Sequence, residues 1–171
     1  PIIPSIIWCD SRAVEIGKKA EKKIKREVLE NQILNSPGNF TASKLRWVYE
    51  NDKDSFSKIY KIMLPGDFIA FKMTGKISTT PSGLSEGVMW DYHSNSVNSE
   101  ILEVYDIDKS IIPDIVDNIG NQGNLSEEIC DKFGFRRKIK ISYRTGDQPN
   151  NAFSLNVLNP GEIAATAGTS A

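Results

Sequence analysis

The order of hydrophobic and polar positions predicts helices over most of the chain. Between residues 13 and 31, Ile16, Ala20, Ile24 and Val28 recur at every fourth position, which is the spacing of one apolar helix face. The lysines and glutamates between them then form the solvated face. The same reasoning predicts further helices at 41–48, capped by Thr41, at 68–73, capped by Asp67 and closed by Gly75, and at 99–105 and 126–133.

Strands are predicted near the two ends of the sequence. The apolar run of residues 1–8 predicts a short buried strand that ends at Trp8. Residues 139–143 alternate between apolar and polar positions, as a second strand would. Residues 79–87 are expected to form a polar loop. The pattern is that of a helix-rich α/β chain. Because one front strand cannot make a sheet alone, we expect its partners, and more of the protein, outside these residues.

Composition adds limits on the partners and the compartment. The chain has 171 residues, of which 39% are hydrophobic and 25% charged, and these values are ordinary for a globular domain with its own core. A net charge of −1 argues against nucleic acid or an anionic membrane as a partner. No apolar run approaches the length of a transmembrane helix. Cys9 and Cys130 lie far apart, which favours reduced thiols in a cytoplasmic protein and no metal site.

Candidate chemistry lies in the last part of the sequence. Gly146-Asp147-Gln148 is predicted to be a turn between two apolar, strand-like runs, and Gly168-Thr169-Ser170 is predicted to be a second turn. An aspartate at a turn can accept a proton, although most aspartates of Gly-Asp pairs only hold turns. A small-residue turn can offer backbone N–H and hydroxyl groups to phosphate. Together the two turns favour phosphoryl transfer.

Several motifs in a fixed order carry a resemblance to a known family. They are Trp8-Cys9-Asp10-Ser11-Arg12, the run from Leu64-Pro65-Gly66-Asp67 to Thr74-Gly75, the stretch Thr80–Gly87, and the Gly-Asp-Gln and Gly-Thr-Ser turns. At this spacing the whole chain resembles the FGGY carbohydrate kinases. The stretches Gly146–Ala152 and Asn159–Glu162 are most similar to the xylulose kinase branch of that family.

The resemblance implies a ribonuclease H-like ATPase fold of the actin/hexokinase type. Residues 1–138 would be the later part of the N-terminal, sugar-binding domain. Residues 139–171 would open the C-terminal, ATP-binding domain. With most of that second domain absent, we expect the 171 residues to be inactive by themselves.

The implied activity is ATP-dependent phosphorylation of a sugar hydroxyl, above all the conversion of D-xylulose to D-xylulose 5-phosphate, with Mg²⁺ on the phosphates. Ribulose, fuculose, rhamnulose, gluconate or glycerol remain alternative substrates. A non-catalytic binding protein with the ATPase fold is the alternative from another class. The resemblance leaves a homodimer open.

Site residues follow from the same resemblance. Asp147 matches the catalytic aspartate that accepts the proton of the sugar hydroxyl, and Gln148 follows it as a sugar contact. Trp8 either packs on the sugar or is a core tryptophan at a strand end. Asp10 and Arg12 either pair with each other across a turn or line the sugar cleft. The residues matched to the ATP phosphates are Gly168, Thr169 and Ser170.

Overall fold

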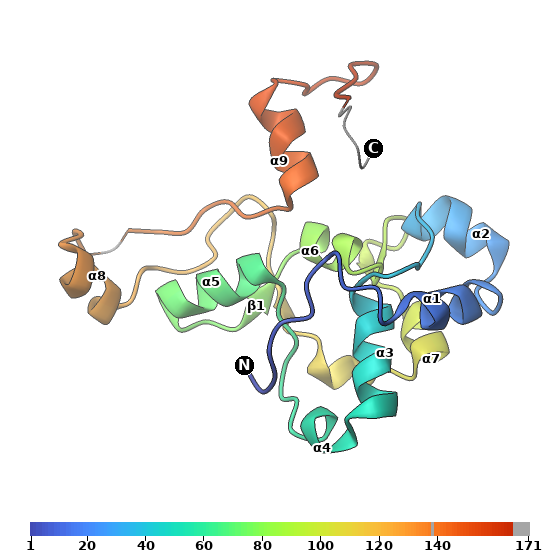
Figure 1. The fold of residues 1–171 in the computed structure, drawn as a ribbon. Coiled ribbons are helices and arrows are strands. Elements are labelled where there is room, and N and C mark those ends of the chain that lie inside the picture. The colour runs from blue at the N-terminus through green and yellow to red at the C-terminus, as the bar shows by residue number, and fades with distance from the viewer. Residues whose placement is uncertain (138, 166–171) are drawn as a thin grey trace.

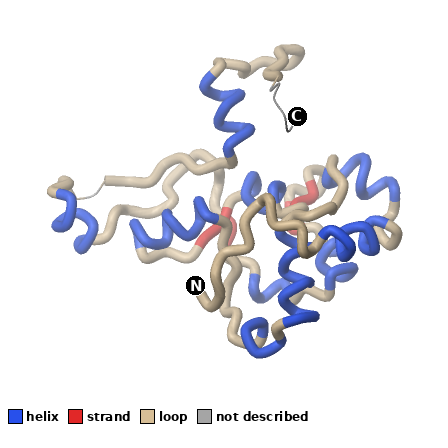
Figure 2. Tube along the Cα trace, in the orientation of Figure 1, coloured by secondary structure: helices blue, strands red, loops and turns tan. Residues whose placement is uncertain are grey.

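The computed structural model describes residues 1–137 and 139–165 as a helix-rich molecule with very short strands (Figure 1). Most of the remaining chain is loop (Figure 2). The helical elements are α1 (Val14–Glu21), α2 (Arg26–Val28), the π-helix η1 (Leu29–Ile33), α3 (Thr41–Asn51), α4 (Lys53–Phe56), α5 (Pro65–Thr74), α6 (Pro81–Glu86), α7 (Ser99–Tyr105), the 3₁₀ turn η2 (Lys109–Ile111), α8 (Glu127–Phe133) and α9 (Asp147–Ser154). The strands are β1 (Ser78–Thr79), β2 (Trp90–Asp91), β3 (Ser96–Val97) and β4 (Asp114–Ile115).

The apolar core lies where α3 packs against α1 and α7. Ile101 and Tyr105 of α7 are among its most deeply buried side chains. The Tyr105 hydroxyl is 2.8 Å from the Ser43 hydroxyl on α3, so the one polar atom of this ring keeps a hydrogen-bond partner. Because α3 and α7 are far apart in sequence, this contact fixes the centre of the fold.

The prediction of one continuous helix over residues 13–31 is wrong. The apolar face is buried as expected, but α1 ends at Glu21, and a turn separates it from α2 and η1. Lys25 has an extended backbone, with ψ of 138°, and its N–H donates to the Glu100 carboxylate at 3.0 Å. A tertiary hydrogen bond therefore replaces a helical one at this point.

The predicted strand at residues 1–8 is also wrong. This segment forms no strand, and Ile7 is 56% exposed. The Lys44 ammonium group on α3 donates to the Ile7 carbonyl at 2.7 Å, so a side chain holds the segment rather than a sheet. The strands that do form pair as β1 with β4, parallel, and β2 with β3, antiparallel.

Residues 79–87 are not the predicted polar loop, since they contain the end of β1 and all of α6. Thr80 caps α6 by accepting a hydrogen bond from the Gly83 N–H at 3.2 Å, and Pro81 occupies the first helical position. Both residues are standard helix-start signals. Thr41 is likewise the first residue of α3 rather than its cap, and no side-chain cap is present there.

Helices predicted at 68–73, 99–105 and 126–133 are confirmed as α5, α7 and α8. Residues 139–143 form no continuous strand, but their backbone bonds to the 120–125 stretch, for example from the Ile141 N–H to the Gly123 carbonyl at 2.8 Å. This pairing leads the chain to α9, which stands apart from the other helices (Figure 1). Within the described residues, no helix is both long and apolar enough to cross a membrane.

Candidate active site

The predicted turn around Asp147 is the start of a helix. Gly146 is the residue before α9, with an extended backbone (φ −71°, ψ 174°), and Asp147 is the first helical residue. An acidic side chain there complements the partial positive charge of a helix N-terminus, and Pro149 in the first turn lacks an N–H that would have no partner. The Asp147 carboxylate accepts the Gln148 N–H at 2.8 Å and is otherwise exposed to solvent.

Glu86, at the end of α6, lies directly beside this helix start. Its carboxylate occupies the space on Gly146 where any other residue would carry a Cβ, since the nearest oxygen lies 1.1 Å from that position. Desolvation there, followed by the neighbouring charges of Asp147 and Asp67, raises the pKa of Glu86. The structure therefore places a second carboxyl group next to Asp147, and the sequence reasoning missed it.

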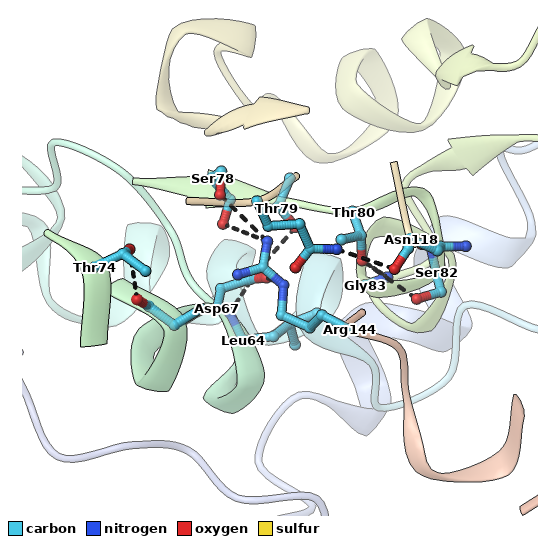
Figure 3. A network of polar contacts seen from close by, with 12 residues as sticks. Leu64, Asp67, Thr74, Ser78, Thr79, Thr80, Ser82, Gly83, Asn118 and Arg144 are labelled. Carbon is cyan, nitrogen blue, oxygen red and sulfur yellow. Dashed lines mark hydrogen bonds and ion pairs between the residues drawn. The ribbon is translucent and has the colours of Figure 1, made fainter. Parts of the chain in front are cut away.

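A buried polar network lies just before the helix start (Figure 3). The Asp67 carboxylate, 4% exposed, accepts hydrogen bonds from the Thr79 hydroxyl at 2.9 Å and from the Leu64 N–H at 3.2 Å. The Arg144 Nε atom lies 3.5 Å from Asp67 Oδ1, which makes an ion pair. Desolvation is the largest influence on Asp67 and raises the pKa of its carboxyl, while Thr79, Arg144 and Leu64 oppose it.

Arg144 joins this network to β1 and to the segment that follows β4. Its Nη2 atom donates to the Ser78 carbonyl at 3.2 Å and lies 3.3 Å from the Ser78 hydroxyl. Its own N–H donates to the Asn118 carbonyl at 3.0 Å, and the Asn118 side chain accepts the Ser82 N–H at 3.2 Å. The Nε and Nη1 atoms of Arg144 are buried without a hydrogen-bond partner.

Sequence reasoning reached Asp67 only as a helix cap. The structure corrects this, because α5 begins at Pro65 and Asp67 is its third residue, from which the side chain reaches back to accept the N–H of Leu64, the residue before the helix. Gly75, with a left-handed backbone at φ 73°, closes α5 as predicted. Arg144 carried no local signal, because its partners lie far from it in the sequence.

The candidate sugar-binding residues near the N-terminus lie on a separate segment. Trp8 is 82% exposed, so it is not a core tryptophan. Asp10 and Arg12 form a two-pronged ion pair with distances of 2.7–3.0 Å, and the Arg12 guanidinium lies 4.7 Å from the centre of the Trp47 ring. Hydrogen bonds from Arg12 lower the pKa of the Asp10 carboxyl to about 2.

Gly168, Thr169 and Ser170 lie outside the described residues. Two open hollows on the surface are lined by side chains of α1, α2 and the residues up to Ser36, and neither is lined by Trp8 or Asp147. The candidate site is therefore defined by the exposed Asp147 and the polar groups that hold the chain before it.

Comparison with known proteins gives the class. Residues 1–154 match the model of the N-terminal domain of the FGGY family of carbohydrate kinases, and the chain belongs to this family. A xylulose kinase of Staphylococcus xylosus is 29% identical over 99% of this chain and 35% of its own length. A glycerol kinase of Mycoplasma capricolum is 25% identical over 99% of the chain and 34% of its own length.

Solved structures confirm the predicted fold class. A xyloylose kinase from Brucella ovis superposes with a TM-score of 0.83 at 23% identity, over 94% of this chain and 33% of that one. A gluconate kinase from Lactobacillus acidophilus gives a TM-score of 0.79 at 21% identity, over 89% of this chain and 31% of that one. The chain spans about a third of the length of the relatives that it matches.

Proposed function

We propose that the full-length protein transfers the terminal phosphoryl group of ATP to a hydroxyl group of a sugar, with D-xylulose as the substrate. Membership of the FGGY family supports the reaction class. The xylulose kinases among the relatives favour the substrate, while glycerol and gluconate kinases define the alternatives. The observation that carries the proposal is Asp147, an exposed carboxylate at a helix start that is joined to the folded body.

In this mechanism Asp147 is the general base. Its free carboxylate oxygen accepts the proton of the sugar hydroxyl while the hydroxyl oxygen attacks the γ-phosphorus, and ADP leaves. ATP enters as its Mg²⁺ complex, in which the metal offsets the phosphate charge. Gln148 follows the base in the sequence, and we propose that its side chain hydrogen-bonds the same sugar.

The remaining roles are assigned by position. Trp8 presents an exposed aromatic face on which a sugar can pack, and the Asp10–Arg12 pair fixes the segment behind it. Gly168, Thr169 and Ser170 are proposed to meet the ATP phosphates. The family match to the N-terminal domain runs to residue 154, and we propose that the domain boundary lies before it, with residues 1–138 in the sugar-binding domain and 139–171 opening the ATP-binding domain. We also propose a cytoplasmic location, in which sugar and ATP are both available.

The experiment is a coupled kinase assay of the full-length protein on a panel of ketoses and polyols, with an Asp147→Asn variant. We expect ATP turnover that depends on D-xylulose, and a loss of kcat of about 10²–10⁴-fold in the variant, because general bases contribute this much. ATP affinity should change little. Asp131→Asn is the matched control, since this exposed carboxylate on α8 pairs only with Arg137 in the described contacts.

Three outcomes separate the alternatives. Turnover that is faster with glycerol or gluconate than with xylulose would show that the substrate is one of these compounds and not xylulose. Sugar binding without turnover would favour the non-catalytic binding protein. An Asp147→Asn variant that keeps more than about a tenth of wild-type kcat would remove this residue from the base role.

A further inference from the structure

Arg144 is exceptional among the last described residues. Across residues 139–165 it is the one buried side chain, with 9% exposure, and α9 itself buries no residue. It precedes Asp147 by three positions. The place of the proposed base relative to the body therefore depends on what holds Arg144.

Three parts of the body hold it. Asp67 comes from the first turn of α5, Ser78 comes from β1, and Asn118 follows β4, as Figure 3 shows. Asp67 is itself fixed by the Thr79 hydroxyl on the same strand. The carbon chain of Arg144 also lies over Gly66, with Cγ and Cδ 3.8 Å from the position of a Cβ there. These contacts fix both the backbone and the side chain of Arg144.

We propose that the Asp67–Arg144 ion pair positions the Gly146–Asp147 helix start and so sets where the base meets the sugar hydroxyl. The proposal rests on the proposed function of Asp147. Arg144 and Asp67 are positioning residues and touch no reacting atom. Misplacement of a reacting group by about 1 Å can lower the rate by about 10²-fold. Loss of the Asp67–Arg144 contact can therefore have a large effect on kcat.

Stability alone explains the pair poorly. A buried ion pair often contributes no more than apolar side chains of the same size would, because both charges must leave water. Here two nitrogen atoms of Arg144 are buried without a hydrogen-bond partner, which adds to that cost. What Arg144 provides, and an apolar side chain does not, is a directional contact, since its planar guanidinium faces Asp67 while the Nη2 atom donates to the Ser78 carbonyl.

The experiment compares Arg144→Met, Arg144→Lys, Asp67→Asn and the Asp67→Asn/Arg144→Met double variant in the full-length protein. Arg137→Met is the matched control, because it removes an exposed arginine–aspartate pair close by in the chain. We expect Arg144→Met to lower kcat by about 10- to 100-fold while the KM values for sugar and ATP stay within about twofold. Arg144→Lys, which keeps the charge and loses the planar fork, should recover part of this loss.

The double variant and a fold check separate positioning from general damage. Assays are run at a temperature at which circular dichroism shows each variant folded. If the pair acts as a unit, the double variant should lose no more kcat than Arg144→Met alone. A kcat within about twofold of wild type in folded Arg144→Met, or a change confined to KM, would overturn the proposal.

A second readout does not depend on activity. Amide hydrogen exchange at residue 144, whose N–H donates to the Asn118 carbonyl, and at Asn150, whose N–H donates to the Gly146 carbonyl, should become at least several-fold faster in Arg144→Met and stay unchanged in Arg137→Met. If the wild-type protein phosphorylates no sugar, the proposed function fails and this exchange result still decides whether Arg144 holds the helix start. If the wild type is active, Asp147→Asn is inactive and exchange in Arg144→Met equals wild type, only the positioning proposal fails.

Discussion

The helical body and the segment that carries Asp147 are held by different kinds of interaction. The buried apolar cluster runs from Ala20 to Ile112 and joins α1, α3, α6 and α7. Residues 139–165 place no apolar side chain in that cluster, and they expose Phe153, Leu155 and Ile163. Their one buried anchor is charged. Apolar burial is strong and has no direction, whereas the polar anchor is weak but directional.

This difference suits the proposed function, in which the carboxylate of Asp147 must be held in one direction. The body provides stability, and a few directional contacts set the position of a segment that adds little stability itself. Substitutions in the two regions should therefore give different defects. In the body they should lower the free energy of unfolding, and in the segment they should change the position of Asp147.

The largest stability effect is expected from truncation in the body. Ile101 is fully buried, so Ile101→Ala should lower the free energy of unfolding by about 2–5 kcal/mol through lost burial and a cavity. Leu155 is 64% exposed, so Leu155→Ala should change the free energy of unfolding by less than about 0.5 kcal/mol. Urea unfolding of the two variants measures both. Equal losses would show that residues 139–165 belong to the same cooperative core.

A second test places the same small change in each region. A Cβ on Gly17 of α1 would lie 1.7 Å from the Gly38 carbonyl oxygen, so Gly17→Ala must push two backbones apart. Overpacking of this kind costs about 1–3 kcal/mol. A Cβ on Gly146 would meet the tip of the Glu86 side chain, which can swing away, so Gly146→Ala should cost less. Thermal melts rank the two. A larger loss in Gly146→Ala would contradict the contrast.

Sequence reasoning reached the elements that depend on local signals. Asp67 in the first turn and the closing Gly75 helped to locate α5, and α7 and α8 were predicted to within one residue of their observed bounds. The same kind of signal was present for α6, in Thr80 and Pro81, but its serines and glycines favoured a loop. The family motifs gave the fold class because they are spread along the whole chain.

What the sequence could not provide are contacts between distant segments. Residues 1–8 have strand-like composition, but strands need partners, and a lysine on α3 holds this segment instead. Arg144 meets Asp67 across 77 positions, and Glu86 meets Gly146 across 60. Asp147 was predicted to lie in a turn and not at a helix start. The local signals for that helix are one proline and one acidic residue in its first turn, and they are weak. The roles of Asp147, Gln148 and Trp8 remain predictions.

The smallest expected effect is the pH dependence of the Asp10–Arg12 pair, which separates an exposed polar anchor from the buried one. Hydrogen bonds from Arg12 lower the pKa of Asp10 from 3.8 to about 2 in the folded protein. A carboxyl with a lowered pKa contributes stability above its unfolded value, and this contribution is lost as the pH falls through the folded value. The stability that Asp10 contributes is therefore lost between about pH 4 and pH 2.

Melting temperatures of wild type and Asp10→Asn should differ slightly above pH 4 and converge near pH 2. Because the pair is exposed, 0.5 M salt should reduce the difference. Asp67→Asn should behave oppositely, since burial raises the pKa of Asp67 above its usual 3.8, so the contribution of Asp67 is fully present below about pH 4 and is lost as the pH rises through its folded pKa. A difference for Asp10→Asn that grows toward pH 2 would mean that the Arg12 contact does not stabilise the ionised carboxylate.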